Sequence, residues 1–188
     1  MTFQRTILAL AFVFCLTVAA AAQGAVRFVA LDGKEQQIDA TFLSKLKRVT
    51  VKASAHGQEG TFEGYNLGEV LAAAGVEFGE KLRGRGLASV LMVEAADGYQ
   101  VVFALPELDA GFTNKVVILA DRRDGKPLAK DEGPFRLVVP DEKRPARGVH
   151  QVTTLKILSL GTPAEDSNRR STTAQVRTHH DALREVYI

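Results

Sequence analysis

The chain has 188 residues, of which 46% are hydrophobic, which is enough for one packed core and too few for two ordinary domains. Its 24 basic and 22 acidic residues give a formal net charge of +2, so it lacks the strong positive field that draws in nucleic acid. The single cysteine, Cys15, excludes a disulfide framework within the chain.

The first 22 residues have the pattern of a secretory signal peptide. Arg5 precedes an apolar run from Ile7 to Ala22, and Ala20 and Ala22 form the small-residue motif that precedes a cleavage site. An uncleaved membrane anchor is the alternative, but the run is shorter than the roughly 20 apolar residues of a membrane span. We expect cleavage after Ala22 or Gly24. The mature protein would then be periplasmic or secreted, would not itself span the membrane, and would contain no thiol.

The segments that follow predict two strands, a loop and a helix. Apolar residues in the strand pattern favour strands over residues 26–31 and 48–53. The polar, glycine-rich stretch 54–64 predicts a loop. Asn66 is a helix-capping residue, and the apolar spacing after it predicts a helix over residues 67–74.

Strands dominate the rest of the domain. The Ala96-Asp97-Gly98 turn predicts a tight hairpin between strands 89–95 and 99–104. Residues 106–110 favour a short helix or turn. Further apolar runs predict strands over residues 115–120, 135–139 and 149–158. This order lacks a regular βαβ alternation and predicts an α+β fold, a mixed β-sheet or barrel with a few short helices.

The sequence changes character near residue 160. We expect one domain over residues 23–160 and a polar C-terminal tail over residues 161–188. The end of the tail, residues 175–188, is compatible with a terminal helix. Its sparse apolar positions are Val176, Leu183, Val186 and Tyr187.

Four segments, in this order along the chain, resemble motifs of the sulfite oxidase family. They are the helix Gly64 to Gly75, the hairpin Ala96 to Tyr99, the stretch Leu119 to Leu128 and the strand Gly133 to Pro140. The resemblance covers about half of the chain and implies a single sulfite oxidase-type molybdopterin-binding fold.

The chain also departs from the family at the metal ligand. In the molybdenum enzymes of the family, a cysteine thiolate after the strand that precedes the helix holds the metal. The corresponding stretch here, Val51 to Gly57, has no cysteine, and the hydroxyl of Ser54 is a poor substitute for a soft thiolate. His56 is a possible ligand, but a lone histidine is more often an ordinary loop residue. We therefore expect no molybdenum and no metal site.

The pattern is similar to an exported, metal-free subset of the family. The resemblance implies a non-catalytic protein that binds a reduced pterin and passes that signal to a membrane receptor that controls cyclic-di-GMP. Two alternatives stay open: a molybdopterin-dependent oxidoreductase or subunit without the usual cysteine, and a scaffold with a vestigial pocket. The sequence carries no hydrolase, phosphate-loop or zinc-protease motif, so we predict no catalytic residue.

Two aspartates are candidates for the pterin ring. The 2-amino and N3–H groups of a pterin can donate two parallel hydrogen bonds to one carboxylate. Asp121 is the first candidate, because it follows the predicted strand where a cofactor-binding loop would begin. Asp97 is the second, although it also has a simple role as a turn residue.

The other candidate contacts are aromatic or basic, and His56 is one of the candidate pterin-binding residues. Tyr99 offers a ring face, and Arg136 can donate to the 4-oxo group of the pterin or fix a neighbouring loop. Arg144, Arg147 and His150 form a basic group that could meet a pterin side chain or phosphate, or simply be solvated.

Overall fold

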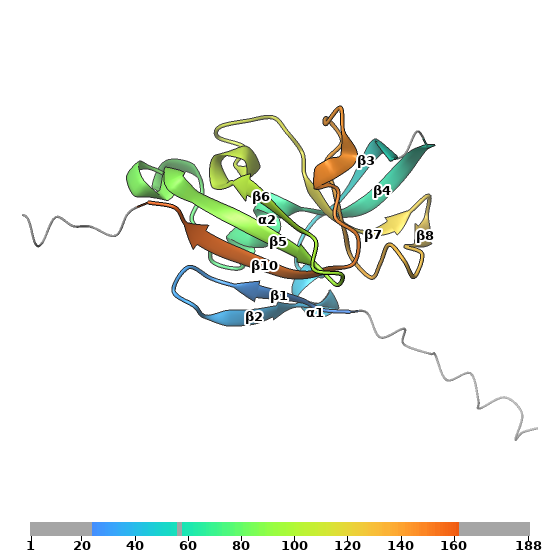
Figure 1. The fold of residues 1–188 in the computed structure, drawn as a ribbon, viewed down its shortest axis with the longest axis horizontal. Coiled ribbons are helices and arrows are strands. Elements are labelled where there is room, and N and C mark those ends of the chain that lie inside the picture. Colours follow the sequence, from blue (N-terminus) through green and yellow to red (C-terminus); the bar gives the residue numbers. More distant parts are fainter. Residues whose placement is uncertain (1–23, 56–57, 162–188) are drawn as a thin grey trace, which may run out of the picture.

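The computed structural model describes residues 24–55 and 58–161, which fold into two β-sheets with short helices between them (Figure 1). The predicted signal peptide, His56 and the predicted terminal helix lie outside the described residues. Within the described part of the chain, no helix is long and apolar enough to cross a membrane.

The first sheet has the strand order β2-β1-β10-β5-β6. Strands β1 and β10 pair in parallel, although they stand at opposite ends of the domain sequence, and the other neighbours are antiparallel. The strands are β1 (Val26–Val29), β2 (Glu35–Ile38), β5 (Ser89–Ala95), β6 (Gln100–Ala104) and β10 (Val152–Ser159). The predicted hairpin is confirmed as the β5–β6 pair.

The second sheet has the order β3-β4-β7-β8, with β9 on β7. Its strands are β3 (Arg48–Ala55), β4 (Gln58–Asn66), β7 (Ile118–Arg123), β8 (Lys126–Pro127) and β9 (Arg136–Val138). Neither sheet closes on itself in the described residues, so the α+β class is confirmed in its open-sheet form and not as a barrel.

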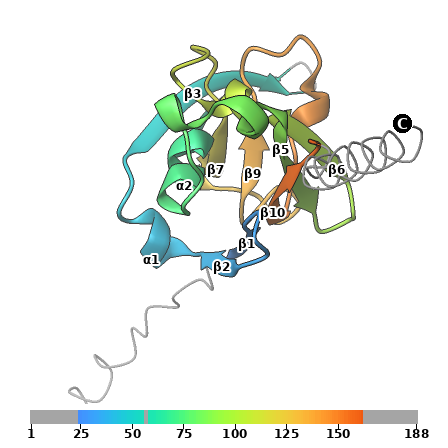
Figure 2. The ribbon, with the colours of Figure 1, turned by 90° about the vertical axis from the view of Figure 1, so that its left-hand side faces the viewer.

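The helices are short and connect the sheets. The α-helices are α1 (Ala40–Leu43) and α2 (Leu67–Ala73), and the 3-10 helices are η1 (Gly79–Lys81), η2 (Gly84–Ala88), η3 (Leu105–Leu108) and η4 (Pro145–Arg147). Figure 2 shows α2 between β3 and α1. The predicted cap is confirmed, because the Asn66 side chain accepts a hydrogen bond from the Glu69 amide at 3.2 Å.

One large core joins the two sheets and α2. Buried side chains of β1, β5 and β10 pack with Leu67 and Leu71 of α2 and with Tyr65, Leu119 and Leu137 of the second sheet. A smaller core lies on the other face of the second sheet and contains Phe62, Ile118, Ala120 and Val138. We call these the inner and outer faces of the second sheet.

The loop predicted over residues 54–64 is wrong, because β3 continues to Ala55 and residues 58–64 belong to β4. Pairing of β4 with β3 and β7 supplies the backbone hydrogen bonds that a polar segment would otherwise take from water. The glycines that suggested a loop permit close packing instead. A Cβ atom on Gly64 would lie 2.2 Å from the Leu119 carbonyl oxygen of β7.

Candidate functional site

A β-bulge in β7 decides which way its charged residues face. Arg122 pairs with Glu63 of β4 and Ala120 pairs with Gly64, so Asp121 is the extra residue between them. Asp121 therefore lies inside a strand, and the predicted position at the start of a loop is wrong. The apolar run suggested an end at Ala120, but pairing with β4 and β8 extends β7 to Arg123.

The two leading candidates lie on opposite faces of the second sheet. Asp121 stands two residues after Leu119, so strand alternation puts it on the inner face, where it accepts from Arg48. The bulge instead brings Arg123 to the outer face, opposite Phe62. Arg136, which pairs with Ala120 in the β7–β9 register, lies over Phe62 on the outer face. A single flat ring therefore cannot place one edge on both side chains.

The outer face carries a compact charged group, which we call the Arg136 cluster: Arg123, Glu132, Arg136 and Phe62. Arg136 donates to Oε1 of Glu132 at 2.5 Å, and Arg123 donates to the same oxygen at 3.4 Å. Both guanidinium groups lie over the Phe62 ring, at 5.3 Å for Arg123 and 5.1 Å for Arg136. Two cations and one carboxylate leave the cluster with a net charge of +1.

Arg136 has an unsatisfied donor inside this cluster. The residue is only 4% exposed, and its Nε atom is buried with no hydrogen-bond partner. Burial is the main cause that lowers the pKa of Arg136 from its ordinary value, although Glu132 opposes the shift. A buried donor without a partner is costly. An acceptor atom of a bound ligand would remove this cost.

The inner face carries a cavity of about 310 Å³ around Asp121. Arg48 donates to both carboxylate oxygens of Asp121, at 2.5 and 3.1 Å, and to the hydroxyl of Tyr65 at 3.0 Å. These hydrogen bonds are the main cause that raises the pKa of Arg48. Leu43, Leu128 and Phe135 also line the cavity. Asp121 thus has an internal two-point partner of the kind that the sequence suggested for a pterin.

Asp97 and Tyr99 lie at the β5–β6 turn and have structural partners there. The Asp97 carboxylate accepts from the Tyr99 amide at 2.9 Å, which is typical of a turn aspartate. The Tyr99 hydroxyl donates to the Ala146 carbonyl oxygen at 2.7 Å, and the side chain is 47% exposed. These contacts fasten the turn to η4.

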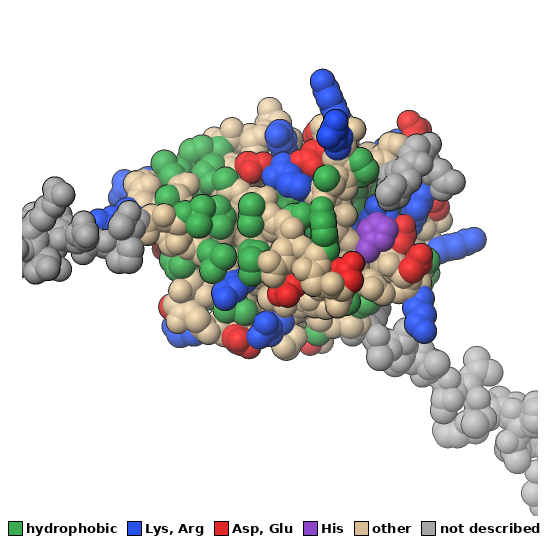
Figure 3. All heavy atoms as spheres, viewed as in Figure 1, with side chains coloured by type: hydrophobic (Ala, Val, Ile, Leu, Met, Phe, Trp, Pro, Cys, Tyr) green, Lys and Arg blue, Asp and Glu red, His purple; other side chains and the backbone are tan. Residues whose placement is uncertain are grey.

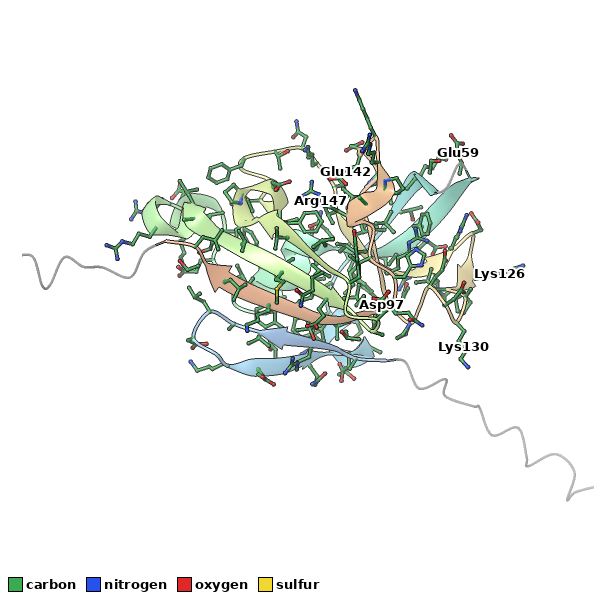
Figure 4. All side chains as sticks on the ribbon, viewed as in Figure 1. Glu59, Asp97, Lys126, Lys130, Glu142 and Arg147 are labelled. Carbon is green, nitrogen blue, oxygen red and sulfur yellow. The ribbon has the colours of Figure 1, made fainter. Side chains whose placement is uncertain are left out.

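The three residues of the predicted basic group, Arg144, Arg147 and His150, differ in exposure and in partners. Arg147 donates to Glu142 at 2.6 Å and to Glu107 at 3.2 Å, and it lies 4.3 Å from the centre of the Phe103 ring. Burial lowers the pKa of Arg147, but hydrogen bonds and charges of both glutamates outweigh it and raise the pKa overall. Figure 4 shows Arg147 beside Glu142, away from Lys126 and Lys130. Arg144 is exposed, and His150 is half-buried next to the Gln151 amide, which donates to the Glu132 carbonyl oxygen at 2.9 Å.

The residues present do not fit a thiolate-bound metal. No group of three histidine, cysteine or acidic side chains in the described residues could hold a metal ion. Ser54, at the end of β3, is exposed and pairs with Glu59 of β4. The chain's one cysteine, Cys15, precedes the described residues. The Arg136 cluster, in contrast, offers donors and one carboxylate that suit the oxygen and nitrogen atoms of a pterin.

The sequence analysis missed three members of the Arg136 cluster and the partner of Asp121. Arg123 and Glu132 stand in charged stretches that look like solvated loops, and Arg48 stands at a strand start. The one sequence signal for them is their place in the chain: Arg123 lies inside the family-like segment 119–128, and Glu132 directly precedes the segment 133–140. Their convergence depends on the pairing of β4, β7 and β9.

The two sheets and their short helices define the chain as an α+β domain. The family model for the oxidoreductase molybdopterin binding domain matches residues 26–160, so the chain belongs to this family. The predicted sulfite oxidase-type family is thereby confirmed.

A solved structure supports the same fold. The sulfane dehydrogenase SoxCD from Paracoccus pantotrophus superposes with a TM-score of 0.54 over 76% of this chain, at 22% sequence identity. This chain spans 40% of the length of that SoxCD chain. No curated protein matches the sequence significantly.

Proposed function

We propose that this protein binds a reduced pterin, without molybdenum, in the Arg136 cluster on the outer face of the second sheet. The observation that carries the proposal is the buried Nε atom of Arg136, which has no partner in a domain of the molybdopterin-binding family. Figure 3 shows charged side chains at the end of the molecule that carries β7 and β8, and others along its lower edge and its top.

Arg136 and Glu132 have complementary roles in this proposal. Arg136 Nε donates to the 4-oxo group of the pterin, because this buried donor has no partner within the described protein. Both arginines donate to Oε1 of Glu132, so we assign Oε2 as the acceptor for the 2-amino or N3–H donors of the ring. The flat guanidinium group of Arg123, with a side chain 25% exposed, offers a surface on which the ring can stack.

The family's cofactor supplies redox chemistry at its metal when molybdenum is bound. The chain's one cysteine, Cys15, stands in the predicted leader and not in the stretch where the family's ligand stands, so the residues of the domain can bind and orient a pterin but not hold a molybdenum centre through sulfur. We therefore propose a binding protein and not an oxidoreductase. Its exported location and its role as a sensor partner of a membrane receptor are supported by the resemblance and by the leader sequence.

The first experiment is analysis of the protein purified from its native host. Released small molecules are identified by mass spectrometry and fluorescence, and metal content is measured on the same sample. We expect a stoichiometric pterin and no molybdenum. Molybdenum with a pyranopterin would replace this proposal with an oxidoreductase, and an empty protein would favour a scaffold.

A titration then locates the site. Tetrahydrobiopterin is added anaerobically to full-length chains in a calorimeter, with folding checked by circular dichroism. We expect Arg136→Gln and Glu132→Gln each to weaken binding roughly tenfold or more, because each removes a buried charged partner. Lys126→Gln, an exposed change on β8, is the matched control.

Asp121→Asn tests the other face of the sheet. The sequence predicts that this substitution weakens pterin binding strongly, because the carboxylate is a two-point acceptor. A pterin in the Arg136 cluster predicts unchanged affinity, since Asp121 faces the cavity with Arg48. Loss of binding in Asp121→Asn, with full binding in Arg136→Gln, would move the site to the inner face.

A further inference from the structure

An apolar cavity lies beside β1 and β10 and shares no lining residue with either charged site. It has a volume of about 210 Å³ and is lined mainly by hydrophobic side chains from β1, β10 and the segments after α2, including Phe28, Val76, Leu82, Leu105 and Ile157. We call it the exit cavity.

One exposed leucine lines the exit cavity, and two more stand in the segments η2 and β10 that contribute Gly86 and Ile157 to its lining or directly after them. Leu31 lines it and is 59% exposed, and Leu87 and Leu160 are 43% and 71% exposed. The Leu160 amide donates to the Ala88 carbonyl oxygen at 2.9 Å, which fixes the end of β10 beside η2. Figure 1 shows this end of β10 near the η1 and η2 turns. The described residues include six large hydrophobic side chains that are exposed, and these leucines are three of the six.

We propose that the exit cavity is the docking site of the chain's own C-terminal segment, residues 175–188. The sequence of this segment places Leu183, Val186 and Tyr187 at the spacing of one helical face. A cavity of roughly 150 Å³ holds one benzene ring. The exit cavity can therefore accept the ring of Tyr187 or the side chain of Leu183.

The position and length of the segment favour it over other occupants. Residues 162–174 connect it to Gly161, four residues after Ile157 of the cavity wall, and reach roughly 40 Å when extended. A tether of this length holds the segment at an effective concentration on the order of millimolar. A second copy or a separate partner must displace it to reach the same apolar surface.

The test measures amide hydrogen exchange in the full chain. The substitution is made in the cavity wall, and the exchange is measured in residues 175–188. We expect Leu31→Asp, at the exposed rim, to speed amide exchange in residues 175–188 roughly tenfold, the ratio expected when an apolar anchor is lost. Val102→Asp is the matched control, because Val102 is 54% exposed on β6 and does not line the cavity.

The reciprocal variant is Leu183→Asp, with Thr178→Asp as its control. We expect Leu183→Asp to change the methyl resonances of Leu82 and Ile157, and Thr178→Asp to leave them in place. Unchanged exchange in Leu31→Asp together with unchanged methyl resonances in Leu183→Asp would overturn the proposal. Methyl shifts that depend on protein concentration would also overturn it and would assign the cavity to a second copy.

Discussion

At the scale of single residues, arginines organise the charged parts of this protein. Arg48, Arg123, Arg136 and Arg147 each lie over an aromatic ring and also pair with a carboxylate. A flat guanidinium group can stack and donate hydrogen bonds at the same time, which an ammonium group cannot do. Arg136 differs from the others in the described residues because a buried donor atom remains without a partner.

Gly64 is the residue at which the second sheet tolerates least change. A Cβ atom there would meet backbone atoms of Leu119 and Ala120 at 2.2 and 2.5 Å, and backbone cannot move aside as a side-chain end can. We expect Gly64→Ala to lower the free energy of unfolding by about 3 kcal/mol or more, measured by urea denaturation.

The control for this prediction is Gly86→Ala. The only close neighbour of a Cβ atom at Gly86 is a methyl group of Leu82 at 3.4 Å, which is ordinary contact. We expect a change within about 1 kcal/mol. Equal losses for the two variants would show that close approach of β4 and β7 does not matter at Gly64.

At the scale of elements, the bulge in β7 and the position of η4 determine the chemistry. Alternation along β7 puts Asp121 on the inner face, where Arg48 meets it. The bulge brings Arg123 to the outer face, where β9 presents Arg136. Arg147 of η4 joins this short helix to Glu107 of η3 and to the Phe103 ring of β6. A residue expected to meet a phosphate therefore has a structural role.

This role gives a prediction for the two arginines of the η4 region. Arg147→Ala leaves Glu107 and Glu142 half-buried without their cation, and we expect a loss of about 1–3 kcal/mol in the free energy of unfolding. The exposed Arg144→Ala should change stability by less than about 0.5 kcal/mol. Urea denaturation of both variants provides the comparison, and greater destabilisation by Arg144→Ala would contradict it.

At the scale of the whole molecule, the first strand pairs with the last. The parallel β1–β10 pair lies inside the first sheet and joins residues that are far apart in sequence. Side chains of both sheets form the large core. The leader and the C-terminal tail are therefore joined to neighbouring strands, the leader to β1 and the tail to β10.

The leader gives a prediction at this scale. We expect the protein recovered from cells that express the full chain to lack residues 1–22 or 1–24, because the small residues around Ala22 suit a signal peptidase. Intact mass measurement of the periplasmic and cytoplasmic fractions tests this. A full-length mass in a membrane fraction would instead indicate an uncleaved anchor.

The sequence by itself determined the features that depend on neighbouring residues. The Asn66 cap, the tight turn with Gly98 at a φ of 84° and the order of the family-like segments are all local, because each depends on residues a few positions apart. These signals were sufficient to predict the α+β class and the family to which residues 26–160 belong.

Only the tertiary structure decided where the polar side chains meet. The predicted loop became β4 because β3 and β7 supply its hydrogen bonds, and one extra residue in β7 brought Arg123 to the face that carries Arg136. Periodicity in the sequence carries no information about such long-range register. The partners of Asp121, Arg136 and Arg147 therefore follow from strand pairing, which brings residues distant in the chain into hydrogen-bonding distance.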